Sequence, residues 1–204
     1  MGDVVDPSTG VRFPLFQTFW DGIRCRSLGV GPREKKVAFV KIKASLEVFF
    51  FMVYSVTYYV DEVAAKADLQ QAQQAGKLGS DEGVCQALTG GAYTKAFQMQ
   101  LVRNVSGAQF TEAFEESLAP RMQGDTAPLE AFKAYFKDKH LDNKTHVVLL
   151  WRQPGDLDVL AKAGTTISSA HLCKSLWENY LDPSSPTPVA RQKWIAGARA
   201  LLST

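Results

Sequence analysis

Hydrophobic and polar positions alternate over a long stretch of the first third of the chain. Residues 37–42 form one short, mainly apolar run, and residues 46–60 form a longer stretch in which every second residue is apolar. The residues that share this face are Leu46, Val48, Phe50, Met52, Tyr54, Val56, Tyr58 and Val60. A two-residue period is typical of an extended strand. Because the opposite face mixes polar and aromatic residues, the pattern predicts a central strand covered on one side and partly covered on the other.

Helical patterns follow this strand. Residues 61–75 are rich in Ala, Gln and Lys and end at Gly76, which predicts a polar surface helix with a glycine stop. Residues 80–88 can form a second, shorter helix before two consecutive glycines. Residues 96–105 return to alternation and predict a half-buried strand.

Two aromatic helices are expected in the middle of the chain. Ser106 and Gln109 have the spacing of a capping box. One face of the helix that they open, up to Pro120, carries Phe110, Ala113, Phe114, Ser117 and Leu118. Thr126 can cap a second helix that runs to about Lys139, and its inward positions are Leu129, Phe132 and Phe136. Both helices present phenylalanines to the interior.

A hairpin and two helices complete the chain. Residues 145–152 and 157–163 flank a Gln-Pro-Gly-Asp turn and predict paired strands, and residues 168–181 and 189–202 predict helices. This order of elements favours an α+β fold with an antiparallel sheet. The length of 204 residues fits one domain over residues 1–204. The glycine cluster at residues 28–33 lacks the third glycine of a dinucleotide-binding loop, which disfavours a Rossmann fold.

Composition narrows the possible partners. There are 23 basic against 21 acidic residues, a net charge of +2 that is too small for a nucleic-acid-binding surface. The longest uncharged run, residues 48–60, is too short to span a membrane, and the N-terminus has no signal or transit pattern. The sequence therefore predicts a soluble intracellular protein, with cytosol and plastid both open. Cys25, Cys85 and Cys173 are expected to be reduced structural thiols.

Motifs for metal or nucleophilic chemistry are missing from the sequence. The three histidines are scattered, and neither a metal-binding spacing nor a nucleophile elbow is present, so no metal and no cofactor is expected. The chain does carry 12 Phe, 6 Tyr and 4 Trp. Arg33, Tyr54 and Ser117 are polar groups that can point into such an aromatic interior. The pattern fits an apolar pocket with a few polar anchors, and it also fits an ordinary core.

Several segments, taken in order, resemble the chalcone isomerase superfamily, in particular its fatty-acid-binding and isomerase-like branches. The segments that carry the resemblance are residues 8–14, 28–33, 53–61, 101–107 leading into 110–118, and 167–172. The resemblance covers most of the chain. It implies an open-faced β-sandwich, in which a long antiparallel sheet is covered by a layer of helices and the ligand lies in the cleft between them.

The resemblance also implies a set of ligand-binding residues. Arg33 takes the place of the cleft arginine of the family, and Tyr54 takes the place of a strand threonine of the true isomerases. Their helix tyrosine, lysine and asparagine correspond to Phe110, Ala113 and Ser117. A later Ser/Thr position corresponds to Lys174. The implied ligand-binding set is Arg33, Tyr54, Phe110, Phe114, Ser117 and Lys174.

These replacements favour binding over catalysis. Cyclisation of a chalcone to a flavanone needs hydrogen bonds to the developing enolate, and Phe110 cannot donate one. A fatty acid suits the same set, because Arg33 can hold a carboxylate by two parallel hydrogen bonds and Tyr54 can add a third. Its tail would meet Phe49 to Phe51, Phe110 and Phe114. The sequence predicts a non-catalytic fatty-acid binder with no catalytic residues.

Two other functions stay open. One is a chalcone isomerase, an intramolecular lyase, with a divergent site. The other is an isomerase-like auxiliary protein that assists an enzyme of polyketide or flavonoid synthesis. A basic stretch that includes Lys35 and Lys41 lengthens the segment between Arg33 and Tyr54. If the correspondence shifts there, Arg24, Arg26 or a lysine would hold the anion instead of Arg33.

Overall fold

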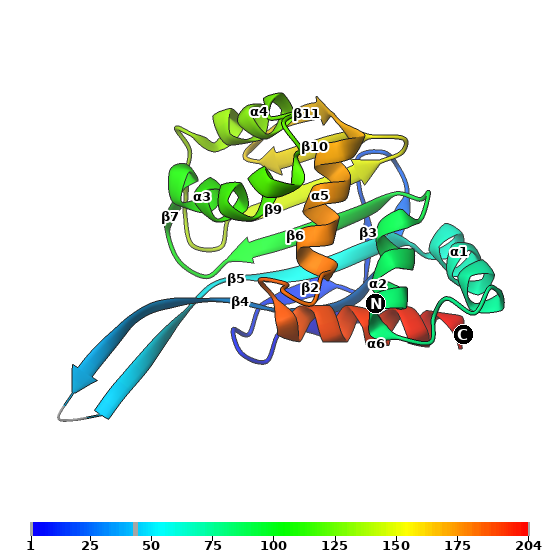
Figure 1. Cartoon of the computed structure of the whole chain (residues 1–204), viewed down its shortest axis with the longest axis horizontal. Helices are drawn as coiled ribbons and strands as arrows, with labels where there is room; N and C mark the ends of the chain where they lie inside the picture. Colours follow the sequence, from blue (N-terminus) through cyan, green and yellow to red (C-terminus); the bar gives the residue numbers. More distant parts are fainter. Residues whose placement is uncertain (1, 43–44, 204) are drawn as a thin grey trace.

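Two very long, paired strands dominate the fold. The computed structural model describes residues 2–42 and 45–203, and the side chains of residues 36–50 lie outside the description. Strand β4 spans Arg24–Ile42 and pairs antiparallel with β5, Ser45–Asp61. Strand β4 thus begins well before the predicted residue 37. Only residues 54–60 of β5 also pair with the next strand, so the rest of the hairpin runs on past the sheet (Figure 1).

These strands belong to a seven-stranded sheet in the order β11-β10-β9-β6-β5-β4-β3, and every neighbouring pair is antiparallel. The other strands are β3 (Phe16–Thr18), β6 (Lys95–Leu101), β9 (His146–Arg152), β10 (Asp156–Ala161) and β11 (Ala163–Ser168). Two small sheets pair β1 (Asp3–Val5) with β2 (Arg12–Pro14) and β7 (Val105–Ser106) with β8 (His140–Leu141). Strands β1, β2, β3 and β11 are short segments that the sequence pattern did not predict.

The helices gather on one face of the sheet (Figure 1). They are α1 (Glu62–Gln74), α2 (Asp81–Gly90), α3 (Gly107–Leu118), α4 (Ala127–Phe136), α5 (Ala170–Leu181) and α6 (Pro188–Leu202), with a 3₁₀ turn at Ala119–Arg121. All six lie where the sequence predicts helices. This arrangement confirms the α+β fold with a long antiparallel sheet under a helical layer.

Local signals explain most helix starts. The Asp61 carboxylate accepts hydrogen bonds from the amides of Val63 and Ala64, and Ser106 and Gln109 form the predicted reciprocal capping box. The Thr126 side chain forms no cap hydrogen bond, contrary to prediction. Helix α4 instead begins with a proline in its first turn, whose fixed φ suits a helix start.

The Lys95 side chain caps the C-terminal end of α2. Its side chain is fully buried, and its ammonium donates to the carbonyl oxygens of Leu88, Thr89 and Gly91 at 3.0, 2.7 and 2.8 Å. These carbonyls belong to the last turn of the helix and its C-cap, where a cation is favoured. The buried Lys95 side chain therefore joins β6 to the helical layer.

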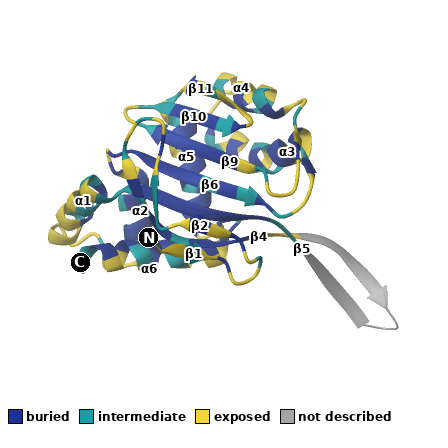
Figure 2. Ribbon diagram, turned by 180° about the vertical axis from the view of Figure 1, so that it is seen from behind, coloured by how far each residue is buried: buried dark blue, intermediate teal, exposed yellow. Residues whose placement is uncertain are grey.

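Both faces of β5 are covered along the sheet (Figure 2). Tyr54 and Tyr58 face the core beneath the helices. On the opposite face, the Tyr59 hydroxyl donates to the Pro14 carbonyl at 2.6 Å, and Ser55 donates to the buried Asp6 carboxylate at 2.7 Å. The N-terminal strands supply this second cover, so β5 is a central strand as predicted.

A bulge in β5 changes which residues share a face. Arg33 pairs with Tyr54, but the next residue of β4 pairs with Met52, which leaves Val53 as the extra residue. Val53 and Tyr54 consequently line the same cavity, and Phe51 lines the space beside it. Strict alternation put Val53 and Phe51 on the face opposite Tyr54, and that prediction is wrong.

Neither a membrane-spanning helix nor a cluster of metal ligands occurs among the described residues. None of the helices in the described part has the length and apolar character needed to cross a bilayer. No group of three or more potential metal ligands occurs among residues 2–42 and 45–203. Cys25, Cys85 and Cys173 are free and buried, in agreement with the sequence prediction.

Candidate functional site

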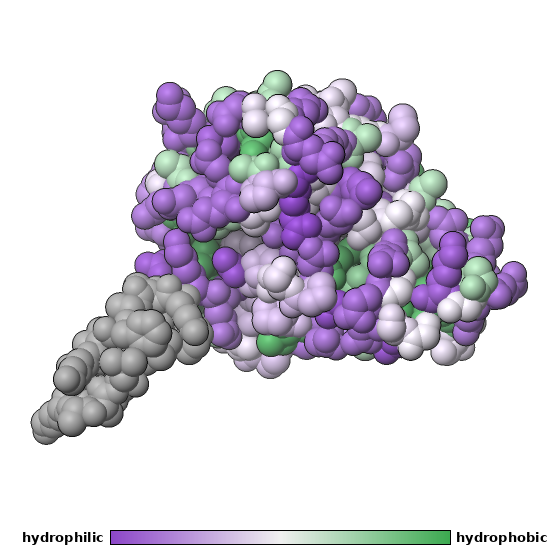
Figure 3. Space-filling model, in the orientation of Figure 1, coloured by the Kyte–Doolittle hydropathy of each residue, from purple (hydrophilic) through white to green (hydrophobic). Residues whose placement is uncertain are grey.

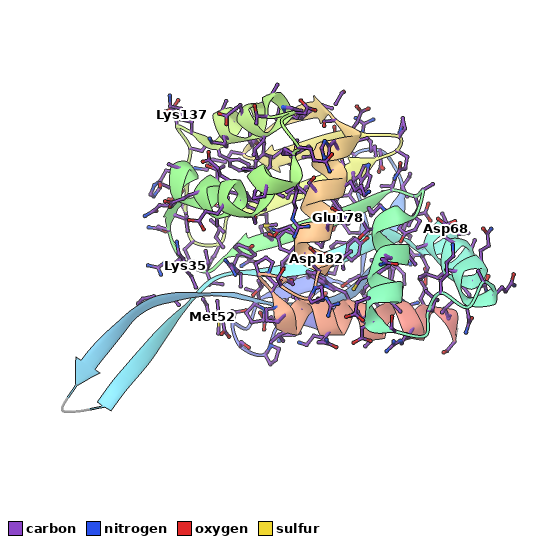
Figure 4. All side chains as sticks on the ribbon, in the orientation of Figure 1. Lys35, Met52, Asp68, Lys137, Glu178 and Asp182 are labelled. Atoms are coloured by element: carbon purple, nitrogen blue, oxygen red, sulfur yellow. The ribbon has the colours of Figure 1, made fainter. Side chains whose placement is uncertain are left out.

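A small pocket lies between the sheet and helices α3 and α5. It encloses about 50 Å³, and we call it the inner pocket. Its lining residues are Arg33, Lys35, Val53, Tyr54, Val105, Gln109, Phe110, Ala113, Phe114, Asn179, Tyr180 and Pro186. Lys35 and Met52, labelled in Figure 4, mark where the long hairpin leaves the sheet beside it. Four of the six predicted site residues therefore meet at one pocket.

Arg33 and Lys35 are the two cationic residues that line the inner pocket, and Arg33 is the one that faces Tyr54. It is half-buried on β4, directly across from Tyr54 in the strand register. Its Nη1 donates to the Pro186 carbonyl at 2.7 Å, and no carboxylate of a described residue lies within ion-pair distance of its guanidinium. A guanidinium has five N–H donors, and within the described residues only one of those of Arg33 has a hydrogen-bond partner.

Two phenols form the polar floor. The hydroxyl oxygens of Tyr54 and Tyr180 are 2.7 Å apart, and both side chains are buried. Burial raises the pKa of both tyrosines, while the nearby Arg33 charge acts in the opposite direction. Both phenols are therefore neutral at neutral pH. The pair has two hydroxyl protons and uses one of them internally, so one donor can serve a ligand.

Phenylalanines make the apolar wall. Phe110 and Phe114 on α3 are both buried, with ring centroids 5.2 Å apart. Behind them, Phe136 lies 4.9 Å from Phe110, and Phe132 lies 5.4 Å from Phe114. The tilted and edge-on ring arrangements are those that aromatic pairs prefer. The phenylalanines that the sequence assigns to an oily cavity thus pack largely against one another.

Ser117 and Lys174 lie away from the inner pocket. The Ser117 hydroxyl donates back to carbonyl oxygens of its own helix, those of Ala113 and Phe114, both at 3.1 Å. Lys174 lines a different groove between α2 and α5, 3.7 Å from Glu178. It precedes Tyr180 by six residues, which places it about 120° away around the helix.

The two alternative arginines lie elsewhere, whereas Lys35, a lysine of the basic stretch, lines the inner pocket together with Arg33. The Arg24 guanidinium stacks over the Phe16 ring at 3.8 Å, and Arg26 forms an ion pair with Glu62 at 2.7 Å. Neither arginine lines the inner pocket. Arg33 lines the inner pocket, and most of the long hairpin lies beyond it.

Sequence reasoning missed two residues of α5 that complete the floor. Tyr180 holds the Tyr54 hydroxyl, and Asn179 is buried beside it. None of the described residues forms a hydrogen bond with the Asn179 side-chain amide. The available signal is two consecutive polar-tipped residues near the end of an otherwise apolar helix face, but their meeting with β5 depends on tertiary packing.

A second space adjoins the inner pocket toward the hairpin. This outer hollow has a volume of about 280 Å³. It is lined by Lys35, Phe51, Val53, Arg103, Asn104, Val105, Gln109 and Glu112, and four of these residues also line the inner pocket. Figure 3 shows that the helix-bearing face is mainly hydrophilic, with small apolar areas recessed between the helices.

Comparison with known proteins identifies the type of fold. The structure is similar to the crystal structure of the fatty-acid binding protein AtFAP1 of Arabidopsis thaliana, with a TM-score of 0.79 over 100% of both chains and 21% sequence identity. The fold is of the chalcone isomerase type. No protein-family model matches the sequence, and no curated protein matches it. The likeness at this identity establishes the chalcone isomerase-like fold alone.

Proposed function

We propose that this protein binds a fatty acid or a similar amphipathic carboxylate, without transforming it, in the cleft between the sheet and the helices. The observation that carries the proposal is the half-buried Arg33, with no carboxylate partner in the described residues, facing a neutral pair of phenols in an apolar pocket. The name of AtFAP1 describes it as a fatty-acid binding protein, which supports the same assignment.

The groups fit a carboxylate. Free N–H groups of Arg33 can donate to both carboxylate oxygens, and the spare proton of the phenol pair can reach one of them. The Asn179 amide adds a further donor on the same floor. Charge-assisted hydrogen bonds contribute about 1.5–3 kcal/mol each, more in a site with little water. The Phe110 and Phe114 rings exclude water from one side.

The α3 positions that correspond to the hydrogen-bond donors of the true isomerases are unsuited to enolate chemistry. Phe110 and Ala113 have no hydrogen-bond donor, and the Ser117 hydroxyl is turned to its own helix. Loss of a single such donor commonly slows a reaction by roughly 100-fold or more. We therefore favour binding over chalcone cyclisation. An enzyme partner in polyketide or flavonoid synthesis stays a prediction.

The proposal is tested by calorimetric titration of the purified, delipidated protein with dodecanoate. We expect Arg33→Gln to weaken binding by roughly 10–100-fold, because the charge-assisted hydrogen bonds are lost. Arg24→Gln, which removes a stacked arginine outside the pocket, is the matched control and should bind like the wild type. Equal affinity of the Arg33→Gln variant and the wild type would refute the proposal.

A second measurement separates binding from catalysis. The absorbance of a chalcone is followed with and without protein. We expect the spontaneous rate in both samples. A protein-dependent rate that disappears in Arg33→Gln would assign the pocket to the isomerase reaction instead.

A further inference from the structure

The inner pocket is too small to hold the whole of the proposed ligand. Its volume of about 50 Å³ compares with roughly 300–1,000 Å³ for pockets that enclose small molecules. One water molecule takes about 30 Å³ in the liquid. A carboxylate group fits this space, whereas a chain of a dozen carbons needs a further compartment.

The interior behind the pocket is closed. Phe110, Phe114, Phe132 and Phe136 are buried, and successive ring centroids in this group are 4.9 to 5.4 Å apart. Protein cores are packed about as densely as organic crystals, so a tail directed inward would have to displace these rings or move α3. Placing the ligand tail among these rings would therefore cost free energy.

The path toward the hairpin is open. The outer hollow, at about 280 Å³, shares Val53, Val105 and two polar residues with the inner pocket. Val105 is buried and Val53 half-buried, so the passage between the two spaces has an apolar floor. The bulge at Val53 creates this floor, because it turns Val53 to the same side as Tyr54.

An exposed ring lies along this path. Phe51 lines the outer hollow with 43% of its surface exposed, and the Arg103 guanidinium lies over its ring at 5.0 Å. Arg103 forms no ion pair with a described residue. The aliphatic stem of an arginine can cover an apolar chain while its head stays in water.

We infer, on the basis of the proposed function, that the ligand carboxylate occupies the inner pocket while its tail passes over Val53 and Val105 and lies in the outer hollow against Phe51. These three residues then determine the preferred chain length. Each methylene that is buried raises affinity roughly four-fold. Affinity should rise with chain length and level off once the tail passes Phe51.

Spin-labelled fatty acids test the direction of the tail. Stearate labelled at carbon 5 and stearate labelled at carbon 16 are bound to ¹⁵N-labelled protein, and the broadening of amide signals is compared. We expect the carbon-16 label to broaden Phe51, Asn104 and Val105, and the carbon-5 label to broaden Tyr54 and Asn179. Broadening of Leu118 and Phe132 by the carbon-16 label would place the tail in the core and overturn the inference.

Variants give an independent measure. In Phe51→Asp we expect hexadecanoate to bind at least ten-fold more weakly, with hexanoate binding unchanged, because only the long tail reaches residue 51. Val63→Asp places the same charge at an exposed valine of α1 and should leave both affinities unchanged. An equal loss for both lengths, or no loss for hexadecanoate, contradicts the inference. If no carboxylate of any length binds the wild type, the proposed function itself fails and the inference fails with it.

Discussion

Lys95 and Arg33 are both basic residues within the fold, and their surroundings differ in kind. The Lys95 ammonium has three N–H donors, and all three meet backbone carbonyl oxygens. The rings of Tyr93 and Trp151 lie 4.7 and 4.4 Å from it. Every direction around this charge is occupied by protein, so Lys95 has no capacity left for a ligand.

Arg33 is the opposite case. Within the described part of the chain it uses one N–H group on the Pro186 carbonyl and has no carboxylate within ion-pair distance, and it borders the inner pocket. A structural cation is saturated by its own protein, whereas a binding cation keeps donors free. The comparison teaches that the number of unused donors, more than burial, separates the two roles.

The strongest test of this contrast is the stability of two methionine variants. Lys95→Met should lower the free energy of unfolding by about 2–3 kcal/mol, because it strips the buried C-terminus of α2 of its donor. Arg33→Met should cost less than about 1 kcal/mol, the value of one hydrogen bond. Urea denaturation measures both. Equal losses would show that Arg33 is structural too.

The next test uses pH. Burial lowers the pKa of Lys95 from 10.5 to about 7. Between these values the unfolded chain binds a proton that the folded protein has released, so the free energy of unfolding should rise with pH from about 7 upward. The slope is at most about 1.4 kcal/mol per pH unit. Below about pH 7 both states are protonated, and this contribution to the slope vanishes.

Denaturation at pH 6.5, 7.5 and 8.5 checks this slope, and Lys95→Met should lack it. These pH values stay below 9 so that the titration of cysteine thiols does not contribute to the slope. Burial raises the pKa of Cys25 and Cys173 to about 12 in the folded protein. Above about pH 9 the unfolded chain loses these thiol protons first, which lowers the stability of the fold. A slope that persists in Lys95→Met would assign the titration to another group.

A smaller effect is expected at the phenol pair. Tyr180→Phe leaves the buried Tyr54 hydroxyl without its partner and should cost about 1 kcal/mol of stability. Dodecanoate should partly compensate, because its carboxylate gives Tyr54 a new acceptor. The shift in melting temperature on adding dodecanoate should therefore be at least as large in Tyr180→Phe as in the wild type. A smaller shift would mean that Tyr180 itself holds the ligand.

The smallest effect is expected at Lys174. Its side chain is 64% exposed and its nearest carboxylate, Glu178, is 3.7 Å away. Lys174→Ala should change stability by less than about 0.5 kcal/mol and leave carboxylate affinity unchanged. A ten-fold loss of affinity would return Lys174 to the binding set that the resemblance implied.

The sequence predicted those parts of the fold that depend on local signals. The Ser106 cap acts on an amide three residues away, and the alternation from Tyr54 onward reports burial on each face of β5. Arg33, Tyr54, Phe110 and Phe114 were found at one pocket because the order of segments resembles a known fold.

What the sequence missed depends on distant contacts or on backbone irregularity. Tyr180 meets Tyr54 across 126 positions of the chain, and no local pattern encodes that meeting. The strand β11 and the N-terminal strands are short and have little periodicity to read. Phe49 and Phe50, which were expected at the ligand cavity, lie outside the described side chains.

The extra residue at Val53 reverses which face of β5 the odd-numbered and even-numbered side chains take. Just upstream of it, Phe51 lies on the side of the outer hollow; downstream of it, the even-numbered residues of β5 face the core beneath the helices. Deleting that single residue would restore strict alternation and so reverse the orientation of the side chains that precede it. It would turn Phe51 outward and bring Met52 into the hollow, with no change in the composition of the strand.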